Sequence, residues 1–218
     1  MMRPGGKMTM GWQGLAHGAS SSKALTGPRV LASMPIGLRA TLLERGHWGA
    51  VRAVLEHRDL DAAVLLEGVR RSEWLGLSAH IALVEAAAEV LGLDGLRALG
   101  ALRTQESTMG GLFPNLLRSW VRSFRSDPAS LLRIGPQIWQ AAFRDAGEFV
   151  IDEVRPFGAS VRIIDCEAMA TSIAWQHIIE GSGAGIMQLA GLALYDLKFV
   201  SDGARTTRGE LRWRAADS

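Results

Sequence analysis

The spacing of the apolar residues changes part-way along the chain, and this change limits the possible folds more than any other feature of the sequence. From Leu31 to Phe143, apolar residues recur with a period near 3.6, which is typical of amphipathic helices. From Glu148 onward, short β-prone segments alternate apolar and polar positions, as half-buried strands do. A helical half followed by strands indicates the α+β class.

Capping and breaking residues divide the first part into separate helices. The clearest helix begins near Ser78, where five apolar residues form one stripe before a glycine: Leu77, Ile81, Val84, Ala88, Leu91 and then Gly92. Asp59 stands where an N-cap belongs, and Asp127-Pro128 supplies a second N-cap with a first-turn proline. Other helices are expected over 38–45, 48–57, 96–102 and 114–124, and before Phe143.

The second part predicts two hairpins separated by a helix. Residues 148–155 and 160–166 form the first hairpin around a turn, and 195–200 and 206–213 form the second. Residues 168–193 between them have a helical pattern. The predicted fold is an N-terminal helical layer packed on a roughly four-stranded antiparallel sheet made of these two hairpins.

The chain of 218 residues is expected to form one domain behind a flexible leader. Residues 1–29 are rich in Gly, Ser, Met and Lys and sustain no apolar period, so they predict the leader, and residues 30–218 form the single α+β domain. The leader lacks the continuous apolar centre of a signal peptide, and no apolar run is long enough to span a membrane. We therefore expect a cytoplasmic protein.

Charge and cysteine content exclude several classes of partner and site. The 24 basic and 22 acidic residues leave a net charge of +2, too even to indicate a nucleic-acid partner. The single cysteine, Cys166, excludes an intramolecular disulfide and a cysteine-rich zinc site. The histidines His47, His57 and His80 lack the spacing of paired metal ligands on one helix, so we expect them at the surface or at helix caps. The sequence predicts no metal and no cofactor.

Motifs in the second half resemble an uncharacterised paralogous family best known from myxobacteria. They are a helix with a basic outer face at 120–125, a D-P-x-x-L-L segment at 127–132, Trp139, two strands within 148–165, the glycine-containing helix at 179–181, and a terminal strand ending in Trp213. The resemblance covers residues 30–213.

That family is distantly similar to the vinyl-reductase sensor domain, the haem nitric-oxide-binding domain and TRAPP transport subunits. The resemblance implies a helical layer on a four-stranded sheet, and a sensing or assembly module more than an enzyme. Two features depart from those relatives. The last predicted hairpin has no cysteine pair, and no histidine occurs between Leu91 and Cys166 to serve as a haem ligand.

Large aromatic residues gather where the helices are expected to converge. These are Trp120, Phe124, Trp139, Phe143 and Trp175. They either line a pocket for an apolar ligand or fill the core. Both roles agree with the predicted architecture, because such a pocket would open between the helices and the sheet.

Two further features, one on the surface and one in helix packing, each allow two interpretations. Arg118, Arg122 and Arg125 form a basic ridge, which either meets an acidic partner or phosphates or is a solvated helix face. The glycines Gly181, Gly183 and Gly185 favour close packing of a helix against the sheet or a second subunit. Anion binding is their alternative, although no Lys-Ser/Thr follows them as in a P-loop.

One group of residues is a candidate for nucleophilic catalysis. Cys166 and His177, with Asp165 as orienting acid, have the residue types of a thiolate–imidazole pair, whereas the plain alternative is a buried structural cysteine. No catalytic residue is assigned. The sequence therefore predicts a non-enzymatic sensor or protein-interaction domain that forms a homodimer or pairs with a related paralogue. The alternative is a binder of a hydrophobic small molecule, a tetrapyrrole or an acyl chain, and a Cys/His-dependent enzyme ranks third.

Overall fold

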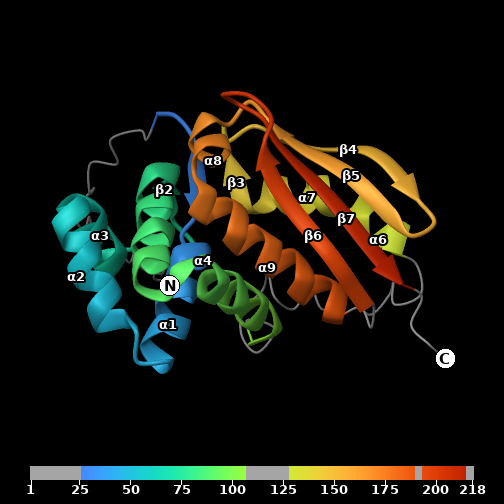
Figure 1. Cartoon of the computed structure of the whole chain (residues 1–218). Helices are drawn as coiled ribbons and strands as arrows, with labels where there is room; N and C mark the ends of the chain where they lie inside the picture. The colour runs from blue at the N-terminus through green and yellow to red at the C-terminus, as the bar shows by residue number, and fades with distance from the viewer. Residues whose placement is uncertain (1–25, 107–127, 190–192, 215–218) are drawn as a thin grey trace, which may run out of the picture.

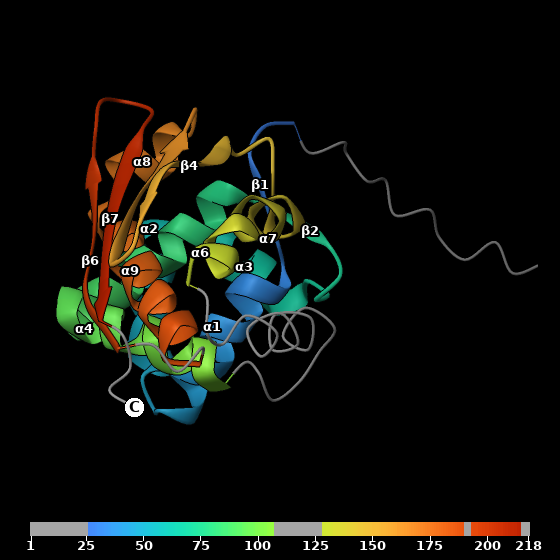
Figure 2. The same cartoon turned by 90° about the vertical axis from the view of Figure 1, so that its right-hand side faces the viewer.

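The computed structural model describes residues 26–106, 128–189 and 193–214. Its helices lie on one face of a four-stranded sheet (Figures 1 and 2). The described helices are α1 (Ser33–Glu44), α2 (Trp48–Arg58), α3 (Leu60–Gly68), α4 (Leu77–Glu106), α6 (Pro128–Arg133), α7 (Gly135–Ala142), α8 (Glu167–Thr171) and α9 (Ile173–Leu189). The described strands are β1 (Arg29–Leu31), β2 (Trp74–Gly76), β3 (Phe143–Arg144), β4 (Glu148–Arg155), β5 (Gly158–Ile164), β6 (Ala193–Ser201) and β7 (Thr207–Arg214). None of these helices is both long and apolar enough to cross a membrane.

The larger sheet is antiparallel, with strand order β4-β5-β7-β6. β4 and β5 form one hairpin, β6 and β7 form the other, and β5 joins β7 with Ala159 opposite Leu211. Alternate residues of the sheet are buried on the face that α9 covers; they include Val161, Ile163, Leu197, Leu211 and Trp213. The predicted α+β fold, a helical layer on a four-stranded sheet of two hairpins separated by helix, is confirmed.

A second sheet, with order β2-β1-β3, was not predicted from the sequence. Its strands have two or three residues, so they are too short to show an alternating pattern. β1 begins at Arg29, the last residue of the predicted leader, and the Leu77 backbone N–H donates to the Pro28 carbonyl at 2.9 Å. Residues 1–25 of the predicted leader lie outside the described residues.

Several predicted helix ends are confirmed. The Asp59 carboxylate accepts a hydrogen bond from the Ala62 backbone N–H at 2.9 Å and caps α3. Gly92 has φ 71° and interrupts α4 where the sequence predicted a stop. The helix expected over 114–124 lies outside the described residues.

The helical stretch predicted over 168–193, with breaks at Gly181, Gly183 and Gly185, forms α8 and α9, and the break lies at Ser172 and not at the glycines. Ser172 is extended, with φ −90° and ψ 104°. Its hydroxyl accepts a hydrogen bond from the Trp175 backbone N–H at 3.3 Å and donates one to Glu85 at 2.9 Å. This side-chain cap begins a new helix and ties it to α4.

Helices α4 and α9 pack so closely that three glycines at their crossing have no space for a Cβ atom. A Cβ at Gly181 would lie 1.9 Å from the Arg97 carbonyl oxygen, and one at Gly185 would lie 2.6 Å from the Ala101 carbonyl oxygen. From the opposite helix, a Cβ at Gly100 would lie 2.5 Å from the Ile178 carbonyl oxygen. Gly183 faces the sheet instead, where a Cβ would lie 2.6 Å from Leu197 Cδ2.

We expect Gly181→Ala to destabilise the protein by about 2–3 kcal/mol or more, because the added methyl collides with a backbone oxygen that cannot move without separating the helices. Gly49→Ala is the matched control: Gly49 lies in helix α2 and a Cβ there meets nothing within 4 Å. The control is expected to stabilise by about 0.5–1 kcal/mol. Urea denaturation followed by circular dichroism measures both, and equal stabilities for the two variants would contradict the described crossing.

Candidate functional site

The structure brings three of the predicted aromatic residues together in one cluster. Trp139 of α7 lies 4.3 Å from Phe143 and 6.1 Å from Trp175 of α9, measured between ring centroids, and the two indoles meet edge to face. All three side chains are buried, Trp175 with 2% of its surface exposed. Trp120 and Phe124, the other members of the predicted set, lie outside the described residues.

Phe149 of β4 also belongs to this cluster, 6.2 Å from Trp139, and was missed in the sequence. Its position in a predicted strand gave the usable signal, because every second strand residue faces the core. A Cβ at Gly135 would lie 2.8 Å from the Phe149 ring, so the glycine that starts α7 lets this ring sit beneath the helix.

A hydrogen bond from the indole fixes Trp139 in the core. Its Nε1 donates to the Gly147 carbonyl oxygen at 3.1 Å. Gly147 has φ 76°, and a Cβ there would lie 1.9 Å from the Ile164 carbonyl oxygen. The turn before β4 therefore requires glycine, and this turn presents the carbonyl that satisfies the only polar atom of the indole.

Two hollows in the surface of the described residues lie away from the aromatic cluster. One is an open depression bordered by charged residues of α2 and α4, Arg58, Glu85 and Glu89, together with Thr171 and Ile173. The other is lined by Asp165, Cys166, Glu167 and Arg205 with Pro28, Ala168 and Thr171. Neither hollow contains a residue of the aromatic cluster or a histidine. The described part of the cluster is buried and lies outside both hollows.

The histidine predictions are partly corrected. His47 and His57 are exposed as expected, but His80 is buried in α4 with 3% of its surface exposed. His80 lies three residues after Leu77 and four before Val84, on the apolar stripe of the predicted helix, and this position was the missed signal. Among the described residues, no group of three or more His, Cys, Asp or Glu side chains is arranged to hold a metal ion.

His80 has an electrostatically unfavourable neighbour. Burial, and then the positive charge of Arg103, lowers the pKa of His80 to about 3, so the imidazole is neutral at pH 7. Arg103 is itself buried, which lowers its pKa to about 10, and its guanidinium contacts Met34 Sδ at 3.5 Å. Within the part of the chain that the structure describes, His80 Nδ1 and Arg103 Nε have no hydrogen-bond partner.

The Cys166–His177 pair has no support in the geometry. Burial raises the pKa of the Cys166 thiol, which is the opposite of the shift that activates a nucleophile. His177 Nδ1 lies 3.8 Å from Glu180 on the next turn of α9, and Asp165 lies 3.6 Å from Arg205. Within the described ranges, no hydrogen bond joins Cys166 to His177 or to Asp165.

A buried carboxylate that sequence reasoning missed holds the sheet edge against the helices. Glu180 of α9 is 4% exposed, and its Oε1 accepts a hydrogen bond from the Phe199 backbone N–H at 2.7 Å. Arg97 of α4 lies 3.6 Å from Glu180 Oε2 and donates to the Leu197 carbonyl at 2.9 Å. These side chains supply partners for backbone groups of β6. The predicted basic ridge of Arg118, Arg122 and Arg125 lies outside the described residues.

The fold is similar to that of H-NOX proteins. The Fe(II) unliganded H-NOX protein from K. algicida and a point mutant of it each give a TM-score of 0.55 at 11% identity, covering 84% of this chain and 96% of theirs. A mutant H-NOX protein from S. oneidensis in the Fe(II) ligation state gives 0.50 at 12% identity, covering 86% and 97%. At this identity the likeness shows the fold alone, which confirms the predicted similarity to the haem nitric-oxide-binding fold.

No protein-family model and no curated protein matches the chain. Membership of the myxobacterial family, and similarity to the vinyl-reductase and TRAPP domains, therefore stay predictions.

The described residues do not fit a haem, the group that the fold family implies. Haem needs a flat cavity and an axial ligand aimed into it. The aromatic rings instead pack against one another, and the described histidines are exposed, beside Arg103, or beside Glu180. The cationic guanidinium next to His80 also disfavours a metal ion there.

We expect acid to destabilise the fold through His80. The unfolded chain takes up a proton below pH 6.5 and the folded chain only near pH 3, so stability is full above pH 6.5 and falls by about 1.4 kcal/mol per pH unit below it. Urea denaturation between pH 4 and pH 7 measures this slope. His80→Gln flattens it, whereas His57→Gln, at an exposed site on α2, leaves it unchanged. Equal slopes for wild type and His80→Gln would contradict the buried neutral imidazole.

Proposed function

We propose that the chain is a non-enzymatic sensor or protein-interaction domain that self-associates, or pairs with a related paralogue, and works without haem. The observation that carries this proposal is the packing of the described aromatic residues: the Trp139 ring contacts those of Phe143, Phe149 and Trp175, and Trp139, Phe143 and Trp175 are buried. The H-NOX-like fold supports a sensing or signalling role in preference to catalysis.

The chemistry of the described side chains also supports a non-enzymatic role. The thiol of Cys166 is buried and its pKa is raised, and no base is hydrogen-bonded to it within the described ranges. In this proposal Gly181 and Gly185 are close-packing residues of the α4–α9 crossing, Gly183 allows α9 to approach the sheet, and the ridge of Arg118, Arg122 and Arg125 is the surface for an acidic partner.

A second candidate is binding of a hydrophobic small molecule, a tetrapyrrole or an acyl chain. The likeness to H-NOX proteins described in their Fe(II) state favours it, because an iron-containing ligand is then compatible with a similar fold. The residues proposed to line the pocket are Trp120, Phe124, Trp139, Phe143 and Trp175. This candidate requires the cluster around Trp139 to open.

An absorbance spectrum and a native mass spectrum of freshly purified protein separate the two candidates. For the first, we expect no absorption band beyond that of tryptophan, even when the expressing cells receive a haem precursor, and a mass equal to that of the bare chain or its dimer. An H-NOX protein purified in parallel is the positive control. A stoichiometric haem band, or a bound lipid or tetrapyrrole mass, would replace the first candidate with the second.

A further inference from the structure

The two outer edges of the four-stranded sheet are treated differently. β6 forms one edge and β4 the other. Along β6, Glu180 accepts from the Phe199 N–H and Arg97 donates to the Leu197 carbonyl, so side chains of α9 and α4 satisfy backbone groups that no strand pairs with. Such covering prevents a sheet edge from pairing with another chain.

The outer half of β4 is more exposed than the first half. Its first half packs beneath α7, where Phe149 meets Trp139, but every residue from 152 to 157 is exposed. Two of these residues are apolar: Val154 is 37% exposed and Phe157 is 62% exposed. Among the described residues, no strand pairs with this edge, which forms the rim of the sheet in Figure 1.

The hairpin fixes which backbone groups of β4 point outward. Arg155 pairs with Gly158 across the two-residue turn, so the backbone groups of Arg155 face β5. Bonding direction alternates along a strand, and the N–H and C=O of Val154 therefore point away from the sheet. A second strand laid antiparallel along this edge would face both groups.

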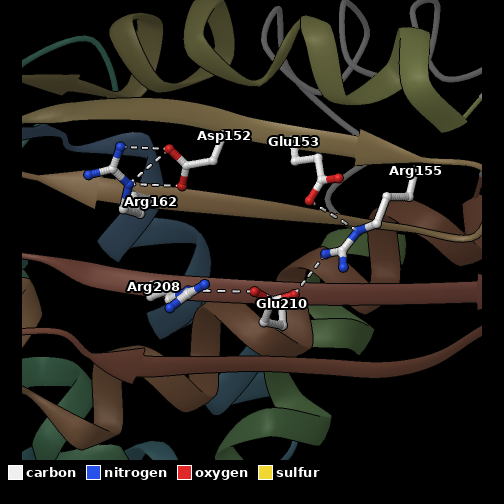
Figure 3. A network of polar contacts seen from close by, with 6 residues as sticks. All are labelled: Asp152, Glu153, Arg155, Arg162, Arg208 and Glu210. Carbon is white, nitrogen blue, oxygen red and sulfur yellow. Dashed lines mark hydrogen bonds and ion pairs between the residues drawn. The ribbon is translucent and has the colours of Figure 1, made fainter.

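Charges on the outer face of β4 match those of a second copy in one register. The side chains of Glu153 and Arg155 lie on the same face, within the network that also joins Arg155 to Glu210 and Asp152 to Arg162 (Figure 3). If two copies of β4 pair antiparallel about Val154, Glu153 lies opposite the partner's Arg155, and the two-fold axis repeats this opposite-charge pair. Charged residues on an edge strand normally prevent a second strand from pairing with it. Here residues of opposite charge would face each other, so the charges favour pairing of two copies.

We propose that a second copy of this chain pairs with the Glu153–Arg155 edge of β4, antiparallel and centred on Val154, to give a continuous eight-stranded sheet. This inference rests on the self-association in the proposed function and names its surface. The paired segment is short, and the register shift between Ile151 and Glu153 limits its extension, so the dimer is weak and concentration-dependent.

Charge reversal tests the register. Glu153→Arg places two arginine pairs across the axis, and Arg155→Glu places two glutamate pairs there, so each single variant is expected to raise the dimer Kd about tenfold or more. The double variant Glu153→Arg/Arg155→Glu restores opposite charges and association. An equimolar mixture of the two single variants is expected to form a heterodimer, because one chain then presents only arginines and the other only glutamates.

Sedimentation velocity across a concentration series measures the Kd values at moderate ionic strength, and circular dichroism verifies that each variant is folded. Arg70→Glu, which reverses a charge at an exposed position between α3 and β2, is the control and is expected to leave the dimer unchanged. A dimer of equal affinity in all variants would overturn the β4 interface while leaving self-association intact. A wild type that stays monomeric at every concentration would overturn both. Recovery in the double variant and in the mixture supports this interface specifically.

Discussion

The close crossing of α4 and α9 is the contact on which the rest of the structure depends. Gly100, Gly181 and Gly185 bring two backbones together with room only for hydrogen between them. This approach places Arg97 and Glu180 at the edge of β6, where they bind its backbone. It also positions Trp175, about two turns before Gly181 on α9, so that its indole contacts that of Trp139. A wider crossing would separate the helices from the sheet and from the aromatic cluster at once.

The fold is similar to that of H-NOX proteins, and its described interior contains a packed cluster of aromatic side chains. A T-shaped pair of indoles contributes about 0.5–1.5 kcal/mol beyond the burial of its area. The Gly147 carbonyl satisfies the indole nitrogen of Trp139, so the described cluster has little to gain from a ligand. Among the described residues, buried polar atoms without a hydrogen-bond partner include His80 Nδ1 and Arg103 Nε, and such atoms reduce stability. The fold is thus compatible with a packed core as well as with a cofactor.

The sequence predicted what local patterns determine. Strand alternation and the helical stripe ending at Gly92 gave the sheet of two hairpins and the main helix, and Asp59 gave a cap. Trp139, Phe143 and Trp175, three of the aromatic residues that the sequence singled out, are buried around Trp139, although sequence could not tell lining from filling. The missed features depend on distant partners: the short strands β1–β3, the break at Ser172 held by Glu85, and the burial of Glu180 and His80. The spacing of apolar residues along the sequence does not indicate contacts between distant residues.

The break at Gly92 gives α4 two separate mechanical attachments. Before it, Glu85 and Glu89 bind Arg58 of α2; after it, Arg97, Gly100 and Ala101 contact α9. Gly92 is exposed and a Cβ there would meet nothing, so the requirement for glycine is a matter of its backbone torsion alone. The positive φ of Gly92 therefore lets one continuous helix change direction between two partners, with α2 bound before the break and α9 packed after it.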